Sequence, residues 1–198
     1  MMNKLTSLEI DALKELVNIG GGHAATSISV LIDKPVEMIV PLIKVMNYEE
    51  LYKDIMAESE IIYAVTIQVS SKGEGMFLFA LPESSASEIC DMMLPPDFEK
   101  SEEMIGSAIT ELSNILVNSF MNSIGQMLEI EFHTSEPGLT IDMFGSIISS
   151  LYMVFDQFDD EVLIIENEFY YSGKKMDALL YFIPEVGVLE NLFKSIGM

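Results

Sequence analysis

Two stretches of this sequence repeat one another. Residues 11–41 read DALKELVNIGGGHAATSISVLIDKPVEMIVP, and residues 107–137 read SAITELSNILVNSFMNSIGQMLEIEFHTSEP. The offset is 96 residues throughout, without a gap. It matches identical residues at several positions, including Glu15 with Glu111, Asn18 with Asn114, and Pro41 with Pro137. Because 96 is close to half of the 198 residues, we interpret the chain as an internal duplication.

The two repeats, of about 1–98 and 99–198, predict the same order of elements: a long helix, a strand, a short helix, a hairpin and a second helix. In the first repeat we expect them at residues 7–32, 35–46, 47–56, 61–82 and 84–94. In the second repeat we expect them at residues 101–127, 130–133, 144–153, 162–184 and 185–196. Hairpin-linked strands favour a largely antiparallel sheet with helices packed on it, so we predict one α+β domain over 1–198.

The charge and hydropathy of the chain exclude several classes of function. Its 32 acidic and 10 basic residues give a net charge of −22, which repels nucleic acid and anionic lipid but attracts a partner that exposes Lys or Arg. No stretch reaches the roughly 18 apolar residues of a membrane span, so we expect no membrane insertion. The N-terminal residues lack the apolar core of a signal peptide, which predicts a cytoplasmic protein.

Few residues are available for metal or nucleophilic chemistry. Cys90 is the single cysteine, and His23 and His133 are the two histidines. These are too few residues for an internal disulfide, a thiolate metal site or a multi-histidine metal site. We interpret these three residues as structural. The glycines at 20–22 lie inside a helical pattern and are not followed by the Lys-Ser/Thr of a phosphate loop.

A polar stripe runs along each long predicted helix, opposite the apolar residues that face the core. It places a carboxylate and a carboxamide one turn apart, with an Asp or Ser one turn earlier: Asp11, Glu15 and Asn18, then Ser107, Glu111 and Asn114. A single Glu-x-x-Asn is usually an ordinary solvated face. Its recurrence at the same register in both repeats favours a functional site.

The three consecutive glycines interrupt the first helix. Each one costs roughly 1 kcal/mol relative to alanine in a helix interior, unless a close approach compensates. Gly20 lies on the core side, which predicts a tight helix crossing there. Gly22 lies on the side of Asn18, where it either serves packing or leaves room for a visiting backbone.

The pattern Asp/Ser-x3-Glu-x2-Asn-x22-Pro occurs twice, as Asp11, Glu15, Asn18 and Pro41 and as Ser107, Glu111, Asn114 and Pro137. It resembles the signature of the CheC/CheX/FliY family of chemotaxis phosphatases. CheX-like members keep one such motif, and FliY-like members add a C-terminal flagellar-switch domain. Two motifs without that domain resemble the CheC branch.

The resemblance implies hydrolysis of the aspartyl phosphate on the response regulator CheY. Asn18 or Asn114 would orient the attacking water, since a carboxamide both donates and accepts hydrogen bonds. Glu15 or Glu111 would pair with the regulator's active-site Lys. The Mg²⁺ that neutralises the phosphoryl group would sit in the regulator, so we expect no metal or other cofactor in this chain.

The remaining motif residues have supporting roles by the same resemblance. Asp11 and Ser107 would help dock the partner or satisfy helix-end amides, and Pro41 and Pro137 would be structural. The duplicated chain already contains the pseudo-two-fold that a single-motif relative obtains by dimerising, so we expect a monomer.

The CheC branch also binds CheD, a receptor-glutamine deamidase, through the short helix of its second half. In this chain that surface would comprise Asp142, Met143, Phe144 and Ile147. Alternatively, Asp142 caps the helix and the apolar residues pack inward. Two further hypotheses therefore stand beside the phosphatase: a weakly active adaptor that binds and regulates CheD, and a structural component of the flagellar switch.

Overall fold

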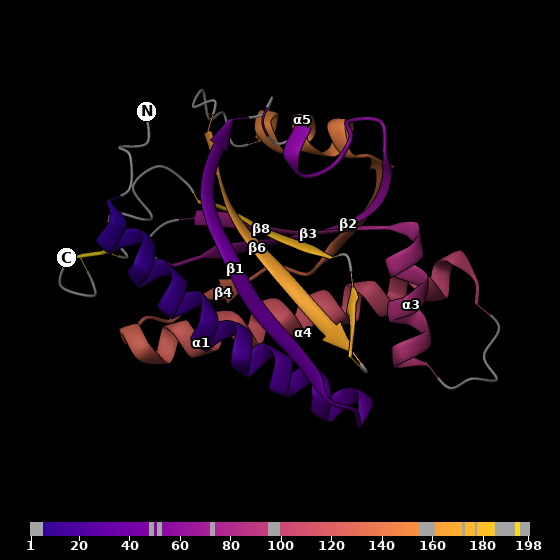
Figure 1. Cartoon of the computed structure of the whole chain (residues 1–198), viewed down its shortest axis with the longest axis horizontal. Coiled ribbons are helices and arrows are strands. Elements are labelled where there is room, and N and C mark those ends of the chain that lie inside the picture. Colours follow the sequence, from indigo (N-terminus) through magenta and orange to yellow (C-terminus); the bar gives the residue numbers. More distant parts are fainter. Residues whose placement is uncertain are drawn as a thin grey trace.

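The computed structural model describes residues 6–47, 50, 53–71, 74–94, 100–154, 161–171, 173–176, 178–184 and 193–194. Its helices are α1 (Ser7–Ile32), α3 (Glu83–Met93), α4 (Glu102–Leu128) and α5 (Phe144–Val154). Its strands are β1 (Val36–Asn47), β2 (Ile61–Ser70), β3 (Glu74–Pro82), β4 (His133–Thr134), β5 (Gly138–Met143), β6 (Glu161–Tyr171), β7 (Lys174–Met176) and β8 (Leu179–Pro184). Figure 1 shows their arrangement.

The described strands form one antiparallel sheet in the order β1-β6-β8-β3-β2, with β4 and β5 both pairing with β2 and with β7 pairing with β6. The predicted α+β class is confirmed. The first strand of each repeat pairs with the hairpin of the other repeat, because β1 pairs with β6 and β5 pairs with β2. The two hairpins meet where β3 pairs with β8.

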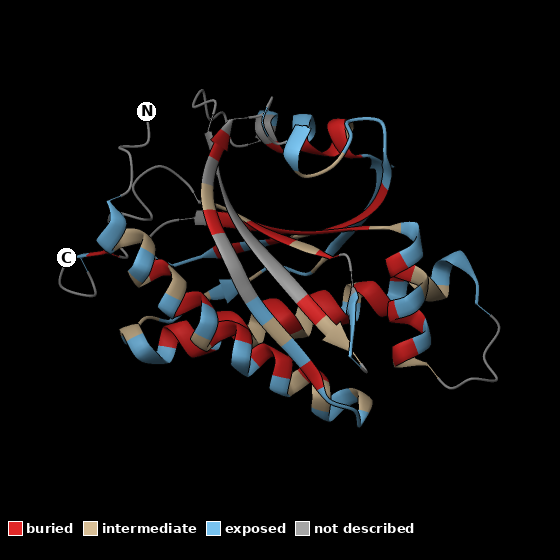
Figure 2. Ribbon diagram, viewed as in Figure 1, coloured by how far each residue is buried: buried red, intermediate tan, exposed pale blue. Residues whose placement is uncertain are grey.

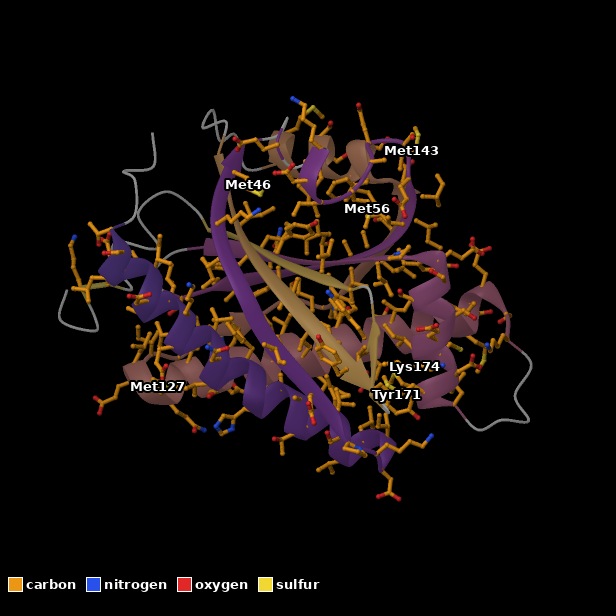
Figure 3. The ribbon with its side chains drawn as sticks, viewed as in Figure 1. Met46, Met56, Met127, Met143, Tyr171 and Lys174 are labelled. Atoms are coloured by element: carbon orange, nitrogen blue, oxygen red, sulfur yellow. The ribbon has the colours of Figure 1, made fainter. Side chains whose placement is uncertain are left out.

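Helices cover both faces of the sheet. α1, α3 and α4 lie on one face and α5 lies on the other (Figure 1). The larger core lies under the three helices and includes Phe77, Phe79, Phe120 and Phe169. A second core lies under α5 and includes Met46, with Met56 packed at its margin (Figure 3).

The same irregularity interrupts the first strand of each repeat. Between Ile39 and Leu42, β1 advances three residues while its partner β6 advances two. Between Thr134 and Gly138, the chain advances four residues while β2 advances three. Each strand thus carries one extra residue beside a motif proline, Pro41 or Pro137. Proline lacks the N–H that a ladder needs, which accounts for a bulge at that point.

Hydroxyl side chains begin the two long helices. The Thr6 hydroxyl accepts a hydrogen bond from the Glu9 backbone N–H at 3.3 Å, and the Glu9 carboxylate accepts one from the Thr6 backbone N–H at 2.6 Å. The carboxylate also accepts from the Thr6 hydroxyl at 2.8 Å. The bond from the Thr6 backbone N–H, and after it the bond from the Thr6 hydroxyl, hold the pKa of Glu9 below its usual value. At the start of α4 the Ser101 hydroxyl accepts from the Met104 N–H, without a reciprocal carboxylate.

The two long helices end in the same conformation. Asp33 follows α1 with φ 52°, and Glu129 follows α4 with φ 55°, so both lie in the left-handed region. These two residues are 96 positions apart, the offset of the repeat. A left-handed residue that carries a Cβ costs roughly 1–2 kcal/mol, and both helix ends bear this cost.

α1 and α4 pack closely side by side. A Cβ added to Gly20 would lie 2.5 Å from Phe120 Cδ2, so the predicted tight crossing at Gly20 is confirmed. Near the same crossing the Ser119 hydroxyl donates to the Ser27 hydroxyl at 2.9 Å. Figure 2 shows buried and exposed residues alternating along both helices, which leaves one face of each helix exposed.

Of the predicted elements, one is wrong, one is described in part and one lies mostly outside the described residues. The strand expected at 130–133 is wrong, because the structure has β4 at His133–Thr134 and β5 at Gly138–Met143 on either side of the bulge. Of the short helix expected at 47–56, residues 50, 53 and 54 are helical. Apart from 193–194, the final helix expected at 185–196 lies outside the described residues. Among the helices that the structure describes, none has the length and apolar character to cross a membrane.

Candidate functional site

The predicted motif side chains lie on the outward faces of α1 and α4. Asp11, Glu15 and Asn18 are all exposed on α1. On α4, Ser107 and Glu111 are exposed and Asn114 is partly buried. Neither Asn is sealed in the core, because the buried residues of these helices lie on their other faces. Each motif therefore presents its carboxylate and carboxamide toward solvent.

Hydrogen bonds hold the carboxamide of the second motif. The Asn118 Nδ2 donates to Asn114 Oδ1 at 2.7 Å and lies 2.9 Å from the Asn114 carbonyl oxygen. The Asn118 Oδ1 in turn accepts from the Thr134 hydroxyl at 2.8 Å. These bonds link α4 to β4. Because the Asn118 Nδ2 is a donor, the oxygen of the Asn114 carboxamide, and not its nitrogen, faces Asn118.

The first motif lacks this support. In the described part of the chain, the Asn18 carboxamide makes no hydrogen bond to another residue. The repeat offset places Gly22 where the second motif has Asn118, and Met38 where it has Thr134. A Cβ added to Gly22 would meet no atom within 4 Å, so the surface beside Asn18 is open.

An open groove of about 590 Å³ lies beside the second motif. Its lining comes from the start of α4 and from β5: Glu102, Glu103, Gly106, Ser107, Thr110, Glu111, Leu139 and Ile141. Carboxylates border one side, and partly exposed aliphatic side chains border the other. Such a groove suits a protein surface that combines a Lys or Arg with an apolar residue.

The first motif has different residues at the groove positions. Ile10 stands where the second motif has Gly106, and Lys14 stands where it has Thr110. Residues 6 and 7 are uncharged, whereas their counterparts are Glu102 and Glu103. The groove positions of the second motif therefore carry more negative charge than the matched positions of the first.

The structure excludes one of the two roles predicted for Asp11 and Ser107. The prediction that Asp11 and Ser107 satisfy helix-end amides is wrong, because Thr6 and Ser101 occupy the N-cap positions and the motif residues lie more than a turn further on. This leaves partner docking as the prediction for both. Within the ranges that the structure describes, no cluster of three or more His, Cys, Asp or Glu side chains could hold a metal ion.

Of the four residues predicted to bind CheD, two are exposed and two are buried. Asp142 and Met143 are exposed at the end of β5, where the Asp142 carboxylate accepts from the Met143 N–H at 2.7 Å. Met143 lies near α5 in Figure 3. Phe144 and Ile147 are buried in the core under α5, so in this conformation they cannot form part of a docking surface. Their apolar side chains pack inward, as the structural alternative supposed.

Comparison with known proteins places the chain among chemotaxis proteins. The family model described as chemotaxis phosphatase CheX matches residues 63–143, which include the second motif, and that of the CheC-like family matches residues 8–45, which include the first. The CheY-P phosphatase CheC of Bacillus subtilis (strain 168) is 24% identical over 204 residues, covering 100% of this chain and 98% of that protein. These matches show that the chain is similar to the CheC/CheX/FliY family in both motifs and along its whole length.

Further matches include FliY and FliM proteins. The flagellar motor switch phosphatase FliY of B. subtilis (strain 168) is 25% identical over 140 residues, covering 69% of this chain and 36% of that protein. Among solved structures, Thermotoga maritima FliY has a TM-score of 0.79 at 22% identity and 98% coverage of both chains. The FliM middle domain from H. pylori has a TM-score of 0.65 at 10% identity, covering 96% of this chain and 99% of that one. These structures show a shared fold.

Sequence reasoning found the motif residues but missed their surroundings. Asn118 lies one helical turn after Asn114, and sequence reasoning assigns it no role. Thr134 was not singled out, because only the folded chain brings β4 beside α4. The acidic groove residues Glu102 and Glu103 were likewise missed, although a pair of carboxylates one turn before the motif could have drawn attention to them.

Proposed function

We propose that this chain hydrolyses the aspartyl phosphate of phosphorylated CheY. The observation that carries the proposal is an exposed Glu111 one turn before a partly buried Asn114 carboxamide, whose oxygen is held by Asn118 beside an open acidic groove. Support also comes from the family, since a curated relative that matches from end to end is named a CheY-P phosphatase. We place this activity in the cytoplasm, with the chain acting as a monomer.

The proposed reaction needs a positioned water more than a strong base. Water attacks phosphorus in line, the bond from phosphorus to the regulator's aspartyl oxygen breaks, and the aspartate leaves as a carboxylate while the protons of the water stay on the released inorganic phosphate. The carboxamide of Asn18 or Asn114 would hold the water by donating and accepting hydrogen bonds. Positioning of this kind is worth several kcal/mol of the barrier, on the order of 10²-fold or more in rate.

The carboxylates would hold the partner in register. Glu15 or Glu111 would pair with the regulator's active-site Lys, which charge-assisted hydrogen bonding favours. The Mg²⁺ that neutralises the phosphoryl oxygens would belong to the regulator, and we propose no metal site in this chain. Asp11 and Ser107, exposed one turn earlier on each helix, would contact the same partner.

A double variant tests this function. We expect Asn18→Ala with Asn114→Ala to abolish phosphate release from phosphorylated CheY, followed as a time course, while the circular dichroism spectrum stays unchanged. Asn122→Ala is the matched control, because Asn122 is an exposed asparagine on α4 outside the motif. Full activity in the double variant would exclude the proposed mechanism.

The adaptor hypothesis retains one favourable observation. Asp142 and Met143 are exposed at the end of β5, so they can contact a partner such as CheD. Under this hypothesis, Asp142→Ala with Met143→Ala would abolish CheD binding in a pull-down assay, and the two Asn variants would leave binding unchanged. Phosphate release at the wild-type rate by the Asp142/Met143 variant would separate the two functions.

A further inference from the structure

We propose that Asn118 and Thr134 are positioning residues that hold the Asn114 carboxamide of the second motif in one orientation. This inference rests on the proposed function, because it assigns a role to residues that support the group proposed to orient water. Neither residue belongs to the recurring motif, and the first repeat has a different residue at each of the two positions.

The support is anchored at both ends. Thr134 belongs to β4 and pairs with Val69 of β2, so the sheet fixes the backbone that carries its hydroxyl. The next residue continues the contact, since the Ser135 N–H donates to the Gln68 carbonyl at 2.9 Å. Asn118 is fixed on α4 and reaches both the side chain and the backbone carbonyl of Asn114. All three members of the chain of bonds are partly buried, which shields them from competing water.

The arrangement changes what the Asn114 carboxamide presents to a ligand. A free carboxamide can turn over and exchange its oxygen and nitrogen, and binding must then select one orientation. With its Oδ1 held by Asn118, Asn114 presents its Nδ2 hydrogens and one remaining oxygen lone pair in fixed directions. A group held in this way loses less entropy when it binds a water or a phosphoryl oxygen.

The first repeat serves as an internal comparison. Gly22 offers no side chain at the position of Asn118, and Met38 offers no hydroxyl at the position of Thr134. The carboxamide of Asn18 therefore has no equivalent support. The inference predicts that removing the support lowers turnover at the second motif and that installing it raises turnover at the first.

The experiment isolates one motif at a time. In the Asn18→Ala background, where the second motif acts alone, we expect Thr134→Val and Asn118→Ala each to lower kcat by roughly 3- to 10-fold without raising KM for phosphorylated CheY. Thr134→Ser should restore kcat, because it restores the hydroxyl. Asn122→Ala is the control on the same helix.

The reciprocal experiment transfers the support. In the Asn114→Ala background, where the first motif acts alone, Gly22→Asn with Met38→Thr should raise kcat by a few-fold relative to Gly22→Ala with Met38→Ala. Urea unfolding of every variant separates loss of function from loss of fold. Turnover within twofold of the background for both Thr134→Val and Asn118→Ala would overturn the inference.

A second measurement does not depend on turnover. In nitrogen-15 NMR spectra of the intact chain, the Asn114 side-chain amide should have a higher order parameter than that of Asn18, and Thr134→Val should lower it toward the Asn18 value. Equal order parameters in the wild-type chain would overturn the inference, even if phosphate release is observed. Absence of release from the wild-type chain, with Asn114 still rigid, would instead count against the proposed function.

Discussion

The first and second motifs lie on helices that are built alike but surrounded differently. Both helices end at a left-handed residue, and both following strands carry one extra residue beside a proline. The side chains around the motifs differ at several matched positions, including Ile10 and Gly106, Lys14 and Thr110, Gly22 and Asn118, and Met38 and Thr134. The backbone that positions the two motifs is thus shared, whereas the support and the access of each carboxamide are local properties.

The largest expected effect separates the two carboxamides. We expect Asn114→Ala to lower the rate of phosphate release by about tenfold and Asn18→Ala to lower it by about twofold or less, because the supported carboxamide is better placed to orient water. Steady-state assays with phosphorylated CheY at saturating concentration measure both values. Equal losses from the two variants would show that the surroundings of the motifs do not affect turnover.

A smaller effect concerns docking at the groove. Glu102→Gln with Glu103→Gln should raise KM by roughly threefold and weaken its dependence on salt, with kcat unchanged, because these carboxylates attract a basic partner without touching the phosphoryl group. Glu88→Gln on α3 is the control, an exposed carboxylate outside the groove. The hypothesis fails if the control raises KM as much as the groove variant does.

The glycines of α1 give a matched pair of stability changes with opposite signs. Gly20→Ala should lower the free energy of unfolding by about 1–3 kcal/mol, because the added Cβ would overlap the ring of Phe120. Gly22→Ala should raise it by up to about 1 kcal/mol, since a Cβ there meets nothing and alanine favours the helix. Urea denaturation measures both changes. Stabilisation by Gly20→Ala would show that α1 and α4 pack less closely than the structure indicates.

The smallest effects should be equal in the two repeats. Asp33→Gly and Glu129→Gly each relieve a left-handed residue that carries a Cβ, and each adds chain entropy to the unfolded state. We expect a net stabilisation of about 0.5 kcal/mol from either substitution. A difference of more than about 1 kcal/mol between them would show that the two helix ends are not energetically alike.

Sequence reasoning recovered the features that depend on local pattern. The helical period located α1 and α4 within a residue or two of their observed bounds, and alternation of apolar residues located both hairpins. It missed β5, because GLTIDM has only a weak apolar pattern and follows a proline. Applying the repeat offset to β1 would have placed a strand at residues 132–143 and found it.

The candidate site was likewise predictable only in the features that depend on local sequence pattern. Residues of one helix face can be read from their spacing, so the exposure of the motif side chains was correctly predicted, apart from the half-burial of Asn114. The bond from Thr134 to Asn118 joins residues of different elements, and their proximity depends on how β4 pairs with β2. The burial of Phe144 and Ile147 likewise depends on which face of the sheet α5 covers.

The exchange of first strands between the repeats has a consequence for how the molecule can come apart. Each repeat on its own would lack the neighbour that its hairpin requires, since β1 pairs with β6 and β5 pairs with β2. Separate polypeptides for residues 1–98 and 99–198 should therefore be unstable alone and should assemble when mixed. In the intact chain, loosening either repeat exposes a hairpin of the other, so both motifs should be lost together in a single melting transition.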